Sequence, residues 1–172
     1  MVAGGGARPP RWGRQGRQGL AAGLEGLIAE LLCSRSDRAR HEDLGGHRAE
    51  IGDPRPGVGV CDDGLPDILW RAISNGEIES EGHGRLQVPW FHMVAYPVTH
   101  AQFAAFIDAA DGFGAEEWWT DLDTEDPVAG RIRRHGNHPA THGSWYDTAA
   151  FCRWLSRRLG FEVRLPDEWE WQ

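Results

Sequence analysis

The sequence has 172 residues, of which 40% are hydrophobic and 26% are charged, so it can hold one ordinary domain preceded by a leader. It carries 26 acidic against 18 basic side chains, a net charge of −8, and this acidity argues against nucleic-acid binding, which depends on a basic surface. Three cysteines without a CxxC spacing argue against a disulfide framework and favour a reduced, cytoplasmic setting.

The N-terminal part of the chain is poor in core-forming residues, since every aromatic side chain except Trp12 lies at or after Trp70. Residues 1–19 are mostly Gly, Arg, Pro and Gln, so we expect a disordered basic leader there. Residues 20–52 begin with leucines at helical spacing and continue as a polar run. We expect a helical linker, and a helix that docks onto another domain is the alternative.

The leader region also resembles a signal peptide, because arginines precede an apolar stretch between residues 20 and 33. Glu25 and Glu30 interrupt this stretch and no Ala-x-Ala cleavage site follows, which argues against secretion and against a membrane span. Two prolines, Pro54 and Pro56, then stop regular structure. We therefore place the folded region at residues 58–172.

Short strand-like runs open the folded region, at residues 68–73 and 86–91. A helix start follows at Thr99, where Gln102 completes a capping box, and we expect the helix to end at Gly112. The next segment, residues 108–126, is rich in acids and carries the pair Trp118-Trp119. It has no EF-hand spacing, so a solvated loop with both tryptophans folded onto the core is preferred over a calcium site.

A longer helix is predicted from Trp145 to Leu159, with Ser144 as its N-cap, Asp147 as the acid of the capping box and Gly160 at its C-cap. Its arginines are expected to face water. The residues expected to form its buried stripe are Trp145, Ala149, Cys152, Leu155 and Leu159. Because burial raises a thiol pKa, Cys152 is interpreted as a packed rather than a reactive cysteine.

A third helix begins at Asp167, which forms a capping box with Glu170, and the given sequence stops at Gln172. Isolated helices shorter than roughly 12 residues are marginal because nucleation is costly. A start signal without a helix body indicates a truncated domain.

Three ordered motifs together resemble the formylglycine-generating-enzyme (sulfatase-modifying-factor) family. They are residues 96–103 (YPVTHAQF), 144–156 (SWYDTAAFCRWLS) and 164–171 (RLPDEWEW), and residues 64–70 (GLPDILW) are similar to the lead-in of bacterial members. The sequence departs from the family pattern at His100, where Asn is usual, at His142-Gly143, and at Asp167, where Thr is usual. The resemblance covers the N-terminal half of the family's domain.

The resemblance implies an α+β, C-type-lectin-like fold with few helices, short strands and much irregular chain. It also implies a parent activity, the metal- and oxygen-dependent oxidation of a sulfatase cysteine to formylglycine, or a related sulfur oxidation that uses non-haem iron. Copper or non-haem iron, and structural calcium, are implied for a full-length relative, together with a protein substrate or fused signalling or repeat domains as partners. The family's copper-binding cysteines match no position here, so no catalytic or cofactor-binding residue is assigned.

One alternative metal site is visible in the sequence itself. His135, His138 and His142 follow an H-x2-H-x3-H spacing, which could place three imidazoles near one metal ion. Pro139 blocks a regular helix through them and Gly136-Asn137 is typical of a turn, so nothing else fixes their directions.

The sequence thus leaves three hypotheses of function. The first is a fragment of a formylglycine-generating-enzyme-like protein that is inactive alone. The second is a non-catalytic lectin-like module that binds a ligand or protein through an exposed Trp118-Trp119 loop and an acidic surface. The third is a complete enzyme that uses the histidine cluster, although the sequence shows no nucleophile–base pair.

Overall fold

The computed structural model describes residues 1–3, 53, 55–80, 82, 84–123 and 136–172. Its centre is an antiparallel sheet of four strands in the order β2-β5-β1-β6. The strands are β1 (Val2–Ala3), β2 (Trp70–Ile73), β5 (Phe91–Val94) and β6 (Val163–Arg164). Few helices, short strands and much irregular chain confirm the expected α+β, C-type-lectin-like class.

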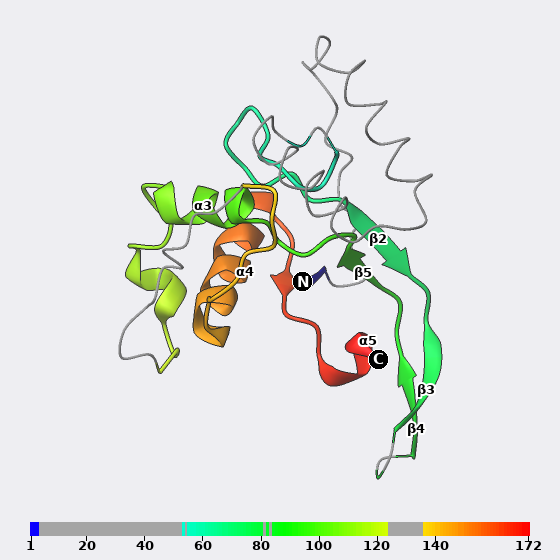
Figure 1. Cartoon of the computed structure of the whole chain (residues 1–172). Helices are drawn as coiled ribbons and strands as arrows, with labels where there is room; N and C mark the ends of the chain where they lie inside the picture. The colour runs from blue at the N-terminus through cyan, green and yellow to red at the C-terminus, as the bar shows by residue number, and fades with distance from the viewer. Residues whose placement is uncertain (4–52, 54, 81, 83, 124–135) are drawn as a thin grey trace, which may run out of the picture.

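A β-ribbon extends from one end of this sheet, formed by β3 (Gly76–Ser80) and β4 (Gly84–Val88). In Figure 1, β2 runs on into β3 and β4 runs on into β5, so the ribbon projects as an arm. The break between β2 and β3, at residues 74–75, lies opposite the break between β4 and β5, at residues 89–90. Pro89 has no backbone N–H to give to a ladder, and this explains why the predicted strand 86–91 is in fact two strands.

The helices α3 (His100–Asp108) and α4 (Trp145–Leu159) lie on one side of the sheet, together with the 3₁₀ helix η1 (Glu116–Trp119) (Figure 1). Both predicted capping boxes are present, at Thr99 and Ser144. Helix α3 ends at Asp108, earlier than predicted, because the chain turns back at Gly112 and the N–H of Phe113 bonds to the carbonyl of Phe106. A Cβ at Gly112 would lie 1.9 Å from that carbonyl oxygen, so only glycine fits there.

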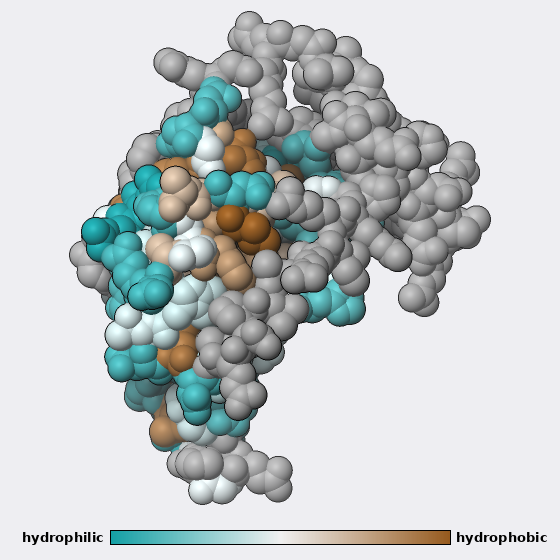
Figure 2. All heavy atoms as spheres, turned by 90° about the vertical axis from the view of Figure 1, so that its left-hand side faces the viewer, coloured by the Kyte–Doolittle hydropathy of each residue, from teal (hydrophilic) through white to brown (hydrophobic). Residues whose placement is uncertain are grey.

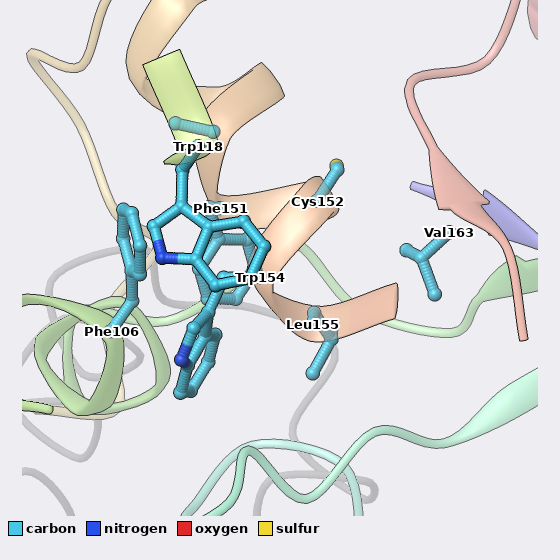
Figure 3. Packing of buried hydrophobic residues seen from close by; sticks show 8 residues of the cluster. Phe106, Trp118, Phe151, Cys152, Trp154, Leu155 and Val163 are labelled. Carbon is cyan, nitrogen blue, oxygen red and sulfur yellow. The ribbon is translucent and has the colours of Figure 1, made fainter. Parts of the chain in front are cut away.

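Aromatic side chains from all three helices form the core. Phe106 and Phe151 are fully buried, and Trp154 is 1% exposed. Their rings are 5.5–5.9 Å apart from centroid to centroid. Figure 3 shows this group on one side of α4, while Cys152 and Val163 lie on the side toward the sheet. The core therefore joins the helices to one another and, through α4, to β6.

The predicted buried stripe of α4 was partly wrong. Cys152 and Leu155 are buried as expected, but Trp145 is 62% exposed, and Ala150, Phe151 and Trp154 are buried instead. The helix carries aromatic residues at both exposed and buried positions, so spacing alone did not identify the face that meets the core. Arg153, Arg157 and Arg158 are exposed, as predicted.

Two further predictions needed correction at the ends of the chain. Residues 1–19 were expected to be disordered, yet Val2 and Ala3 form a central strand; the rest of the leader and the predicted helical linker 20–52 lie outside the described residues. The third helix, α5 (Glu168–Trp171), does form as a single turn. It is stabilised by its capping box at Asp167 and by the ion pair between Arg164 and Glu170. These contacts provide the stability that a helix of four residues lacks on its own.

A buried amide, that of Gln102, connects α3 to the loop before the sheet. Its Nε2 donates to the carbonyls of Gly57 at 3.1 Å and Asp67 at 2.5 Å, and its Oε1 accepts from the N–H of Thr99 at 2.9 Å. The hydroxyl of Thr99 donates to the carbonyl of Val58 at 2.9 Å. A helix cap that was visible in the sequence thus also fastens residues 57–67.

We predict that Gln102→Ala lowers the free energy of unfolding by about 3 kcal/mol, because it leaves two buried carbonyls and one buried N–H without partners. Urea unfolding measures this change. Gln87→Ala is the matched control, since its amide makes one exposed bond to Glu77, and a change within about 0.5 kcal/mol is expected. Equal losses in the two variants would contradict the assigned role of Gln102.

Candidate functional site

Two of the three predicted metal-binding histidines lie at the start of α3. Residues 136–140 run beside residues 98–101: the N–H of His100 bonds to the carbonyl of His138 and the N–H of Ala101 to that of Gly136, each at 2.8 Å. This pairing brings His138 and His142 close enough to influence the charge of His100. His135 lies outside the described residues. The structure therefore joins His100, which sequence spacing did not include, to this pair.

The predicted three-histidine site stays a prediction, because His135 lies outside the described residues. In the part of the chain that the structure describes, no three His, Cys, Asp or Glu side chains are grouped closely enough to hold a metal ion. His142 is exposed and has a left-handed backbone, with a φ of 65°, which turns the chain into the N-cap of α4. His100 and His138 lie at the start of α3, and His142 lies just before the start of α4. No chemistry is assigned to these histidines.

A polar network lies beside them and was missed by sequence reasoning. Asp53, almost fully buried, accepts from Arg55 at 2.6 Å and from the amide of Asn137 at 3.3 Å. Burial would raise the pKa of Asp53, but the hydrogen bonds from Arg55 and Asn137 outweigh it and hold this pKa below its ordinary value. Arg55 also stacks over Tyr96. The network fixes residues 136–137 against the start of the folded region.

The acidic segment after α3 faces the arginines of α4. Arg153 donates to the carbonyls of Trp118 at 3.0 Å and Thr120 at 2.6 Å, and Arg158 pairs with Asp111. Figure 2 views the face of the molecule that carries α3, η1 and α4, and hydrophilic residues cover much of it, with apolar ones between. Asp111 and Glu117 are thus ion-paired with α4; residues 124–126 lie outside the described part.

The two tryptophans of this segment fold onto the core, as the sequence predicted. Trp118 is 5% exposed and its indole N–H donates to the carbonyl of Asp111, while that of Trp119 donates to Phe113. The exposed Trp118-Trp119 loop on which the binding-module hypothesis depended is therefore absent from the structure. That hypothesis keeps only the acidic surface as support.

Cys152 is a packed residue, and the prediction that it is not reactive agrees with its surroundings. Its side chain lies between α4 and the sheet with 3% of the residue exposed. Burial raises the pKa of its thiol to about 11, although the nearby amino group of Met1 acts in the opposite direction. At neutral pH the thiol stays protonated, and a protonated thiol is neither a nucleophile nor a metal ligand.

Several large side chains within the family-like motifs stand in solvent. Trp145 begins α4 and is 62% exposed, and Trp171 ends α5 and is 74% exposed. Beside Trp145, Asp147 is fully buried, and its Oδ2 accepts from the N–H and the hydroxyl of Ser144. Its Oδ1 has no hydrogen-bond partner. An exposed indole at a helix start, with an unsatisfied buried carboxylate oxygen two residues further on, is typical of a surface that another element covers.

Comparison with known proteins identifies the family. The profile of the family described as sulfatase-modifying factor enzyme 1-like domain matches residues 71–172. The chain belongs to this family. The match begins at β2 and includes both capped helices and α5, so the sequence resemblance is confirmed over these elements.

Curated relatives are named formylglycine-generating enzyme. The protein from Mus musculus is 29% identical over 61% of this chain and 36% of its own length, and that from Bos taurus is 24% identical over 94% and 54%. The protein from Streptomyces coelicolor is 30% identical over 48% of this chain and 34% of its own length. The sulfatase-modifying-factor-like chain thus spans about half of these relatives or less. No solved structure matches it.

One absence is also observed. Within the described residues, no helix is both long enough and apolar enough to cross a membrane.

The histidine group at the start of α3 predicts a pH-dependent stability. Burial, and then the charges of His138 and His142, lower the pKa of His100, and the positive end of the helix opposes its protonation too. The unfolded chain therefore binds this proton more readily than the folded chain. The contribution of His100 to the free energy of unfolding is therefore fully present above the ordinary histidine pKa of about 6.5, and it is lost as the pH decreases through that value.

We predict that His100→Asn makes the free energy of unfolding less dependent on pH between about pH 7.5 and 5.5, because it removes the group whose pKa is lowered. Urea unfolding at several pH values measures the slope. The matched control is the parent chain in the same buffers. An unchanged slope in the variant would contradict the interpretation.

Proposed function

We propose that residues 58–172 form the N-terminal, scaffold part of a formylglycine-generating-enzyme-like domain. The complete domain would carry out the metal- and oxygen-dependent oxidation of a sulfatase cysteine to formylglycine, or a related sulfur oxidation with non-haem iron. The observation that carries this proposal is the family match over residues 71–172, in which the motif residues Trp145 and Trp171 remain exposed. The relatives it matches bear the name of that activity and are roughly two to three times longer than the portion matched.

The structure explains why the exposed motif residues matter. An indole buries about 150–250 Å² when it packs, so leaving two of them largely in water forgoes roughly 300–500 Å² of burial. The buried Oδ1 of Asp147, next to Trp145, lacks a donor as well. Both features are accounted for if further chain of the same domain type lies over the start of α4 and the end of α5.

The residues described here do not fit the metal that the parent activity implies. Cys152 is buried with a raised thiol pKa, which is the opposite of what a thiolate ligand requires. The described side chains also form no group of three ligands. No step of the oxidation is therefore assigned to these residues. On this proposal their part is to position the elements on which the rest of a domain folds.

The first test is the activity of the chain alone. We predict no aldehyde in a sulfatase-derived cysteine peptide incubated with the 172-residue chain, oxygen, a thiol reductant and either copper or iron, as followed by mass spectrometry. The intact formylglycine-generating enzyme of Streptomyces coelicolor is the positive control. Aldehyde formation by the chain alone would overturn the proposal.

The second test is a hybrid protein. The matching segment of the Streptomyces coelicolor enzyme, 34% of its length, is replaced by the corresponding segment of this chain. We predict that the hybrid folds and produces the aldehyde, because the scaffold elements correspond. A hybrid carrying Gln102→Ala, which loosens the loop at residues 57–67, is expected to be less stable. A well-folded hybrid without activity would contradict the scaffold role.

A further inference from the structure

The strand β1 occupies an unusual place in the sheet. It lies between β5 and β6, antiparallel to both, with Val2 opposite Met93 and Arg164. Its two residues are fully buried, at 0% and 1% exposure. A two-residue segment from the start of the sequence thus joins two strands that are far from it in the chain, and Figure 1 shows it entering the middle of the molecule.

This strand lies outside the segment that the family match covers. The family match covers β5 and β6 but begins at residue 71, so it does not include β1. Neighbouring strands lie about 4.8 Å apart, and β1 therefore holds β5 and β6 at about twice that spacing. At such a separation β5 and β6 cannot bond to each other. The matched region by itself contains a gap that is one strand wide.

The present occupant fills this gap incompletely. It pairs with two residues of β5, whereas β2, on the other side, pairs with all four from Phe91 to Val94. Ala3 lies opposite His92, whose Nδ1 is buried and has no hydrogen-bond partner. The methyl group of Ala3 cannot supply one. A longer strand with a hydroxyl or amide side chain at this position would satisfy both the backbone and the imidazole.

We propose that the gap between β5 and β6 is an acceptor site for an extended strand, which residues 1–3 fill as an exchangeable substitute. The preferred occupant is a strand from the part of a formylglycine-generating-enzyme-like domain that the match does not cover. This partner rests on the proposed function. Its chemistry is a small or branched apolar side chain at the position of Val2 and a small polar one at that of Ala3, because those are the sites the sheet encloses.

Cys152 reports on whether the gap is filled. Met1 packs against the cluster that contains this cysteine, and the amino group of Met1 is near enough to influence the thiol. Figure 3 places the side chain of Cys152 on the side of α4 that faces the sheet. Displacing β1 therefore exposes a thiol that is otherwise buried.

The first experiment measures that exposure in the full chain. Cys33→Ser and Cys61→Ser leave Cys152 as the single thiol, and its reaction with a disulfide reagent is followed at about pH 8. Val2→Pro removes a ladder donor from β1, and we predict labelling at least about tenfold faster than in the parent. Val2→Ile keeps the strand and should match the parent within about twofold.

Glu79→Pro is a second, matched control, since it places proline in the exposed ribbon and not in the four-stranded sheet. Cys152 should stay protected in this variant. Far-UV circular dichroism, which reports the total helix content, confirms that the Val2→Pro chain is still folded. Labelling of Val2→Pro no faster than that of Glu79→Pro, or loss of the helices together with the strand, would overturn the proposal.

The second experiment tests the acceptor. Overlapping synthetic peptides from the part of the Streptomyces coelicolor enzyme outside its matching segment are added to the Val2→Pro chain, with scrambled peptides as controls. We predict that at least one peptide restores the protection of Cys152 and binds Val2→Pro at least about tenfold more tightly than the parent, whose gap is already filled. No restored protection by any peptide, or equal binding to both chains, would overturn the proposal.

The outcome is independent of catalysis. A folded but inactive hybrid together with restored Cys152 protection would remove the proposed scaffold role and leave the acceptor site intact. An active hybrid with no peptide binding would support the scaffold role and overturn the acceptor site.

Discussion

The hydrogen bonds of Gln102 are the constraint on which the rest of this structure depends. One buried amide holds the N-cap of α3 and two carbonyls of the loop at residues 57–67, so the helix and the entry to the sheet cannot move separately. Phe106, one turn along the same helix, then begins the aromatic core that continues through Phe151 and Trp154. The core positions α4, and α4 in turn supports β6 and the buried side of the sheet.

Local chemistry explains which features could be predicted from the sequence. Helix caps require only residues three or four positions apart, so the boxes at Thr99, Ser144 and Asp167 were all identified correctly. The buried face of α4 depends on what surrounds the helix, and Trp145 was misplaced for that reason. The strand β1 pairs residues at opposite ends of the chain, and neither its composition nor its length gives any sign of it.

The candidate site shows the same division. The spacing of His138 and His142 was visible, but their proximity to His100 arises from the pairing of residues 136–140 with the start of α3. The polar network beside these histidines bonds Asp53 to Arg55 and to Asn137. Asn137 is 84 positions from Asp53, so no short sequence motif could reveal the network. The family motifs indicated the domain correctly because they encode its helix starts, whereas chemistry needs groups that these motifs do not contain.

The central claim is that the family motifs of this chain present a surface that further chain of the domain covers. Hydroxyl-radical footprinting with mass spectrometry measures it directly, by comparing tryptophan oxidation in the chain alone and in the hybrid with the Streptomyces coelicolor enzyme. The account predicts fast oxidation of Trp145 and Trp171 in the chain alone and marked protection in the hybrid, with the buried Trp118 and Trp154 slow in both. Equal oxidation of Trp145 and Trp171 in the two proteins would contradict it.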